Sequence, residues 1–148
     1  MSNIVSPFQM KRNKVVSFSI EQNEISQEYE ATNVSLRADY KISDITKKAS
    51  ALSARVDLFI TLTGITDNEE KIFEINLDMM GLFDGESPQI EEHKFEDMLK
   101  INGISTLMQL SRAYITSTTA LAGFANPINF PMVNVFELIK MKEEMNKK

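Results

Sequence analysis

The only histidine of the chain, His93, lies in an acidic stretch beside Glu91, Glu92 and Glu96. A metal site would need further imidazole or thiolate ligands, and the chain has no cysteine. A general base would need an apolar cleft that tunes its pKa, whereas charged residues surround this histidine. We therefore interpret His93 as a solvated surface residue.

The other residues that could take part in catalysis have no partners in the sequence. Three pairs of adjacent carboxylates occur, at positions 69–70, 91–92 and 143–144. Neighbouring residues on a turn or helix point apart, so these pairs cannot share a substrate. Ser105, Ser111 and Ser117 have no base in a recognisable motif. The segment GLFDG at 81–85 lacks the lysine of a phosphate loop, and DNEEK at 67–71 lacks the spacing of a calcium loop. The sequence predicts no enzyme, no cofactor and no metal site.

Composition limits the classes of partner. The 148 residues fit one domain, residues 1–148, with 16 basic and 21 acidic side chains and a net charge of -5. This charge repels phosphate backbones, so we expect no nucleic-acid partner. No apolar stretch approaches the ~18 residues of a membrane span, and the N-terminus lacks a signal-peptide pattern. We expect a soluble cytoplasmic protein without membrane insertion.

Alternation of apolar and polar residues dominates the first half of the chain. It predicts four strands, at 15–20, 34–42, 54–65 and 71–79. The pattern is clearest in the second strand, where Val34, Leu36, Ala38, Tyr40 and Ile42 share one face. Short connections and one polar face are typical of an antiparallel meander.

The second half of the chain has helical patterns. Ser87 and Pro88 predict the start of a short helix, and apolar spacing predicts a long helix from about Ile104 that ends at Gly123. Asn134 is a suitable N-cap for a last helix. The predicted fold class is therefore α+β: a four-stranded antiparallel β-meander followed by a long helix and a short C-terminal helix packed on one face.

Two segments carry more apolar residues than ordinary surface. The end of the fourth strand, at 79–83, does not alternate, and the loop at 124–133 is apolar although Pro127 and Pro131 interrupt it. Nine methionines add adaptable apolar side chains. Either these segments pack within their own domain, or they form an open groove for extended apolar peptide.

The sequence also resembles the SecB export-chaperone family. The matching residues are Phe8, Gln9, Arg12, Gly81, Leu82, Phe83, Arg112, Ile115, Thr116, Ser117, Gly123, Asn129, Pro131, Val133 and Asn134. The resemblance implies an ATP-independent holding chaperone that binds unfolded or precursor polypeptides in hydrophobic grooves. It also implies a homotetramer, built as a dimer of dimers.

The resemblance assigns positions to both surfaces. Its peptide-binding groove corresponds to Val34, Leu36, Ala38, Phe83, Phe124, Ile128, Phe130, Phe136, Leu138 and Met141. The small-residue face of the long helix is what a close helix contact between copies requires, at Ser111, Tyr114, Ile115, Thr118, Thr119 and Ala122. A helix crossing inside one monomer would have the same composition.

The chain departs from the family at the positions that dock the SecA motor. The family's docking patch is acidic, whereas the first strand carries Val15 and Ser19 and the fourth offers Glu74 and Asn76 in shifted positions. Export through SecA is therefore one hypothesis. The alternatives are a SecB-like chaperone dedicated to one partner, such as an antitoxin, and an adaptor protein whose apolar loop binds one folded partner.

Overall fold

The computed structural model of the protein describes residues 4–23, 33–87, 89–124, 128 and 130–147. Four long strands come first: β1 (Phe8–Gln22), β2 (Asn33–Lys48), β3 (Ala51–Ile65) and β4 (Lys71–Glu86). The helical elements follow: α1 (Glu92–Met98), the π-helical turn η2 (Leu99–Gly103), α2 (Ile104–Leu121) and α3 (Val135–Asn146). This order confirms the α+β class with the sheet before the helices.

The strands form one antiparallel sheet in the order β1-β4-β3-β2. β2, β3 and β4 are consecutive neighbours, as in a meander, whereas β1 lies beside β4 and not beside β2. Residues 23–32 connect β1 to β2, and at roughly 3.3 Å a residue they are long enough to pass three strand spacings of roughly 4.8 Å. The polar linker therefore permits β1 to reach the far side of the sheet.

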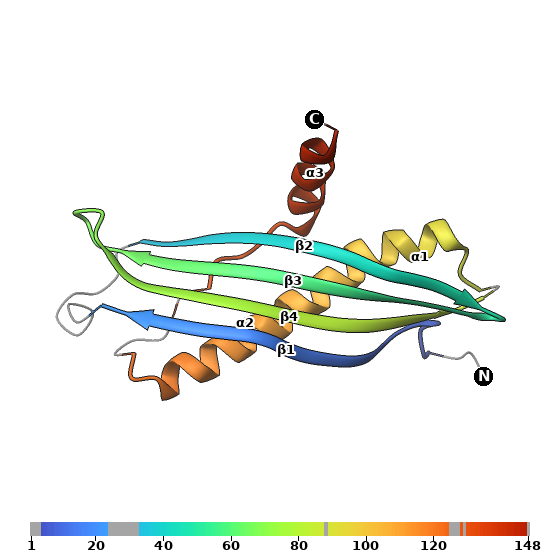
Figure 1. Ribbon diagram of the computed structural model, residues 1–148, viewed down its shortest axis with the longest axis horizontal. Coiled ribbons are helices and arrows are strands. Elements are labelled where there is room, and N and C mark those ends of the chain that lie inside the picture. The colour runs from blue at the N-terminus through green and yellow to red at the C-terminus, as the bar shows by residue number, and fades with distance from the viewer. Residues whose placement is uncertain (1–3, 24–32, 88, 125–127, 129, 148) are drawn as a thin grey trace.

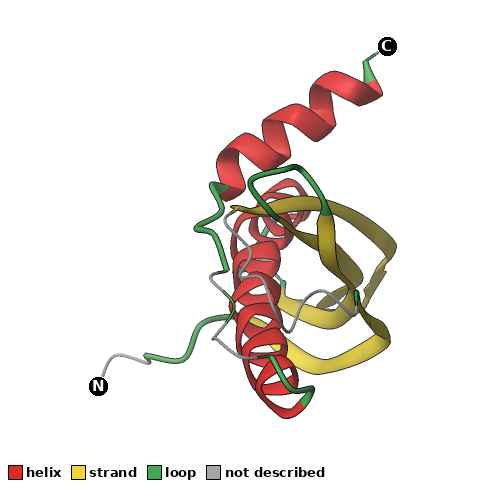
Figure 2. Cartoon of the chain, turned by 90° about the vertical axis from the view of Figure 1, so that its left-hand side faces the viewer, coloured by secondary structure: helices red, strands yellow, loops and turns green. Residues whose placement is uncertain are grey.

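One face of the sheet, the inner face, is covered by helices. α2 runs obliquely across this face, and the sheet curves around it (Figures 1 and 2). On β3 the alternate residues Val56, Leu58 and Ile60 are fully buried there. Because each large apolar side chain removed from water contributes roughly 1.5–3 kcal/mol, period-two patterning fixes which face the helices cover.

The ends of the helices agree with the sequence in two places and differ in one. α2 ends at Leu121, and Gly123 has φ +88°, a left-handed conformation that favours glycine. Asn134 caps α3, accepting a hydrogen bond from the Glu137 backbone N–H at 3.2 Å. The predicted helix start at Ser87 is wrong: the Ser87 N–H donates to the Ser50 carbonyl at 2.7 Å, and α1 begins only at Glu92. Pro88 lies outside the described residues.

The last helix stands apart from the others. α3 projects beyond the β2 edge of the sheet (Figures 1 and 2) and contains no buried residue. α2, by contrast, buries Ile104, Leu107 and Ile115 completely. The body of the domain therefore consists of the sheet, α1, η2 and α2, and α3 is attached to its edge.

Candidate functional site

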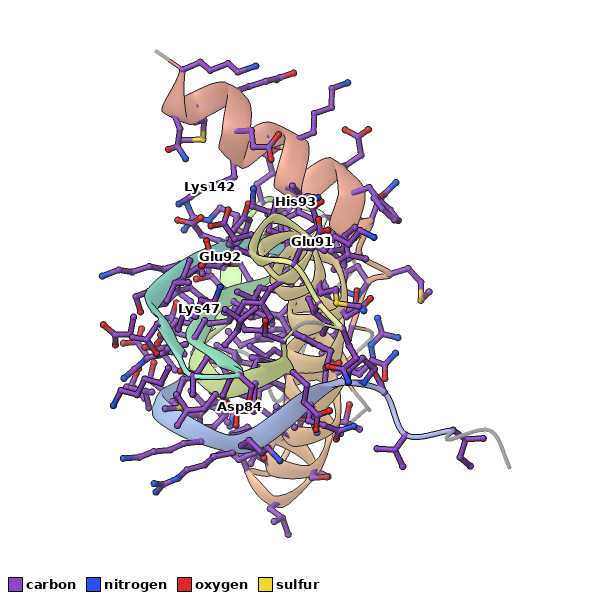
Figure 3. The ribbon with its side chains drawn as sticks, turned by 90° about the vertical axis from the view of Figure 1, so that its right-hand side faces the viewer. Lys47, Asp84, Glu91, Glu92, His93 and Lys142 are labelled. Atoms are coloured by element: carbon purple, nitrogen blue, oxygen red, sulfur yellow. The ribbon has the colours of Figure 1, made fainter. Side chains whose placement is uncertain are left out.

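Most residues considered for catalysis lie at or near the surface, whereas Ser111 is buried. His93 and Glu91 are both exposed, with Nδ1 to Oε2 at 3.4 Å, and Figure 3 shows them at the start of α1 beside Glu92. The Ser105 hydroxyl donates to the Ile101 carbonyl at 2.6 Å, as in an ordinary helix turn. Among the described residues there is no group of three His, Cys, Asp or Glu side chains placed to hold a metal ion. These residues do not form an acid–base site.

A pair of carboxylates on the outer, uncovered face of the sheet was missed in the sequence. Asp57 accepts two hydrogen bonds from Arg55, at 2.7 and 3.1 Å, and is 6% exposed. Desolvation, and then a hydrogen bond with Asp57, raise the pKa of Asp78 to about 6. The alternation in β3, which puts Arg55 and Asp57 on one face, was the available signal. None of these three side chains lines the hollow at the end of the sheet, and we interpret the cluster as a structural feature of the outer face.

The sheet has a polar hollow at one end. It encloses 460 Å³ where β1 begins and β4 ends, and its walls include Pro7, Gln9, Ser50, Asp84, Glu86 and Gln89. These side chains are not paired as a base and a nucleophile would be. None of the residues expected to bind peptide lines it.

Eight of the ten groove residues lie at least partly at the surface, and we call them the apolar strip. They are Val34, Leu36, Ala38, Phe124, Ile128, Phe136, Leu138 and Met141. The three from β2 are half-buried on the inner face, and Leu138 is half-buried on α3. Phe136 and Met141 are 66% and 59% exposed. Large apolar side chains that are exposed on a helix without any fully buried residue are available to a partner.

The other two groove residues are sealed in the core. Phe83 is 1% exposed and stacks on Phe8, with ring centroids 5.4 Å apart. A side chain at Gly81 would meet the Phe83 ring at 2.7 Å, so this glycine provides the space that the ring fills. Phe130 is 8% exposed, with the Arg112 guanidinium 5.0 Å from its ring centroid. In this conformation neither ring can contact a client, which corrects both assignments.

Arg112 also holds the segment that leads to α3. It donates to the Pro131 carbonyl at 3.3 Å, and it lies 3.5 Å from the Met132 sulfur. Its Nε is buried without a hydrogen-bond partner. Asn129 and Pro127 of the same loop lie outside the described residues.

Polar contacts hold α3 to the edge of the sheet. The Lys142 ammonium donates to Asp39 Oδ1 at 2.8 Å and lies 5.7 Å from the centre of the Tyr40 ring. Lys100 of η2 pairs with Glu143 at 3.2 Å. Figure 3 labels Lys142 next to α3. Sequence reasoning had no signal for these contacts, because the partners are far apart in the chain.

The residues expected between copies divide into two groups. Ser111, Ile115 and Thr119 are buried beneath α2, and the Ser111 hydroxyl lies 3.8 Å from the sulfur of Met79 on β4. These three side chains therefore lie inside the monomer, where α2 packs on the sheet, and cannot reach a second copy. The sequence left open a contact within the monomer, and its partner is the sheet rather than a crossing helix. Tyr114 and Thr118 are half-buried, and Ala122 is exposed. The open face of α2 carries Gln109, Ala113, Thr116, Ser117 and Ala120.

Comparison with solved structures identifies the architecture. The SecB-like chaperone Rv1957 of Mycobacterium tuberculosis, solved in complex with a ChAD peptide from the Rv1956 HigA1 antitoxin, superposes with a TM-score of 0.56. The match covers 86% of this chain and 91% of that chain at 11% identity. The chain has a SecB-like fold. The expected SecB-like architecture is thereby confirmed, at an identity that establishes the fold alone.

Other comparisons add little to the SecB-like fold. A protein of unknown function from Streptococcus agalactiae matches with a TM-score of 0.45 and 11% identity, covering 83% of this chain and 97% of that chain. No protein-family model and no curated protein matches the sequence. Within the described residues, the helices of this SecB-like fold are too short or too polar to cross a bilayer.

Proposed function

We propose that this protein is a chaperone that holds non-native polypeptides, without ATP, along the apolar strip. The observation that carries the proposal is the exposure of Phe136 and Met141 on a helix that buries none of its own residues. A helix of this kind has unsatisfied apolar surface, and the half-buried inner side chains of β2 continue it. Contacts of this type need no sequence motif in the client.

The structural neighbour supports a polypeptide partner, because it was solved with a peptide from an antitoxin. A second candidate function follows from the same observation: a chaperone dedicated to one partner, such as an antitoxin. Delivery to SecA remains the weakest form of the proposal. The first-strand positions that the family makes acidic carry the uncharged Val15 and Ser19, and the fourth strand offers Glu74 and, paired with Ser19, the uncharged Asn76.

We further propose that the protein assembles into a tetramer through the open face of α2. The exposed small side chains Ala113, Ser117 and Ala120 allow another helix to approach closely. Native mass measured by light scattering tests the assembly. A monomer at the concentrations that suppress aggregation would remove the tetramer from the proposal and leave the client site.

Aggregation assays test the function. Several unrelated proteins, diluted from denaturant, should stay soluble at a near-stoichiometric ratio of this protein. Protection of a single protein only would support the dedicated chaperone, and protection of none would overturn the proposal. The variant carrying Phe136→Ser and Met141→Ser should lose most of the protection. Leu121→Ser is the control, because Leu121 is 88% exposed but lies outside the apolar strip.

A further inference from the structure

The edge of the sheet beside α3 is formed by β2. β2 pairs with β3 along one side, and its other side ends the sheet. The opposite edge, β1, has two register shifts and carries Lys11, Arg12 and Lys14, features that discourage strand pairing. β2 has no register shift before Ser43. The two edges therefore differ, and the regular one lies next to the apolar strip.

One hydrogen bond reveals how the backbone of β2 is oriented. The Tyr40 N–H donates to the side chain of Asp39 at 2.8 Å, so it is not used in the ladder with β3. Backbone groups alternate direction along a strand. Val34, Leu36 and Ala38 stand an even number of residues from Tyr40, so their N–H and C=O groups also point to the open edge. The described chain supplies no hydrogen-bond partner to these three residues on that side.

The same three residues carry the apolar side chains of β2 on the inner face. Val34, Leu36 and Ala38 are paired with Gly64, Leu62 and Ile60, in the rows that face the helices. Each residue thus offers backbone hydrogen bonds to the edge and an apolar side chain to the apolar strip. The regular edge ends at Tyr40. Its N–H already donates to the Asp39 side chain, and Lys142 of α3 donates to the same carboxylate.

We propose that the client binds as an added strand along β2 from Val34 to Ala38, with alternate side chains resting on the apolar strip. This inference rests on the proposed function and specifies its binding mode. An extended client matches the two-residue repeat of the edge, and pairing satisfies backbone groups of both partners. A second copy is the less suitable occupant, because it would bring its own Arg37 and Lys41 alongside the same cations of the first.

Backbone methylation of a probe peptide tests the binding mode. The probe is a fluorescein-labelled peptide of alternating leucine and serine, compared with two isomers that carry N-methyl groups on either the leucine or the serine amides. Both isomers have the same composition and the same loss of donors. In an added strand only one set of amides faces β2. One isomer should bind like the parent, and the other should bind about 10-fold or more weakly by fluorescence anisotropy.

Each outcome decides a different point. If both isomers bind like the parent, strand addition is wrong while the proposed function stands. If the parent itself fails to bind, and unfolded proteins also gain no protection, the proposed function fails. The isomer that survives gives the strand direction: methylated serine amides are tolerated in antiparallel pairing, and methylated leucine amides in parallel pairing.

A substitution in β2 tests the same binding mode by changing the protein instead of the peptide. Ala38→Pro removes an N–H that points to the open edge, and an edge strand tolerates proline there. Ala38→Val keeps the N–H and is the matched control. The proline variant should bind the parent probe at least about fivefold more weakly than the valine variant. Equal binding by the two variants, or a smaller native mass of the proline variant that points to pairing between copies, would overturn the proposal.

Discussion

Lys142 of α3 reaches Asp39 of β2, and this ion pair joins two residues that are 103 positions apart in the chain. The Nζ to Oδ1 distance is 2.8 Å, and the same carboxylate oxygen accepts the backbone N–H of Tyr40. The pair therefore both closes the regular edge of β2 and positions α3. α3 has no fully buried residue, so polar contacts of this kind act together with the half-buried Val135, Leu138 and Ile139 to position the helix.

Reversing the charge of Lys142 should loosen α3 without unfolding the body. The ion pair is partly exposed, so its loss should lower the opening free energy of α3 by about 0.5–1 kcal/mol. Amides at 135–146 should then exchange hydrogen roughly two- to fivefold faster in Lys142→Glu. Lys140→Glu makes the same charge change on the exposed side of α3 and should leave exchange unchanged. If the two variants exchange equally, the ion pair does not position the helix.

The sequence predicted those features of the fold that depend on residues close together in the chain. Alternation identified the strands, and Asn134 identified the start of α3, because both depend on neighbouring residues. The position of β1 beside β4 and the contact of Lys142 with Asp39 depend on residues far apart in the chain. Neither has a periodicity that a single sequence displays.

Only part of the candidate site could be predicted, because the sequence does not show which apolar residues the rest of the chain covers. An apolar residue in a run has the same pattern whether a ligand or the core covers it, so Phe83 was assigned to the surface although it is 1% exposed. Gly81 was the missed signal, since a glycine within a strand leaves space for a neighbouring ring, here that of Phe83; Gly85 leaves space for Phe95 in the same way. The same ambiguity affected Ser111 and Thr119, whose small side chains are buried within the monomer.

Truncation of Phe83 should lower stability, whereas truncation of Phe136 should weaken binding of the probe peptide. Phe83→Ala removes a sealed ring and should cost about 3–5 kcal/mol of unfolding free energy. Phe136→Ala should change stability by less than about 0.5 kcal/mol, because its ring is 66% exposed, yet weaken probe binding several-fold. Urea unfolding and anisotropy together check both expectations. A large stability loss in Phe136→Ala would place that ring in the core.

Arg112 should stabilise the path of the chain into α3. Its hydrogen bond to Pro131 and its contact with Phe130 are offset in part by the unpartnered Nε. Arg112→Met should therefore cost only about 1 kcal/mol of unfolding free energy but speed hydrogen exchange at 130–134. Arg37→Met is the control, since Arg37 is exposed on β2. Unchanged exchange at 130–134 would show that Arg112 does not hold this segment.

Asp78 should make stability fall as pH rises. Desolvation and the hydrogen bond with Asp57 raise its pKa to about 6 in the folded chain, against 3.8 for a free carboxyl group. The folded state therefore binds this proton more tightly than the unfolded state, and the stability it contributes below pH 4 is lost between about pH 4 and pH 6. Arg55, paired with Asp57, opposes the shift.

Asp78→Asn isolates this effect, because an amide keeps a donor for Asp57 and has no charge to desolvate. Allowing for solvent screening of a partly exposed group, the variant should be more stable than the natural chain by about 1 kcal/mol at pH 7, and the difference should vanish near pH 4. Urea unfolding at a series of pH values measures it. Asp84→Asn, on the same strand and face, removes a carboxylate outside the pair and serves as the control. A stabilisation by Asp78→Asn that is constant across pH would arise from packing and would contradict the raised pKa of Asp78.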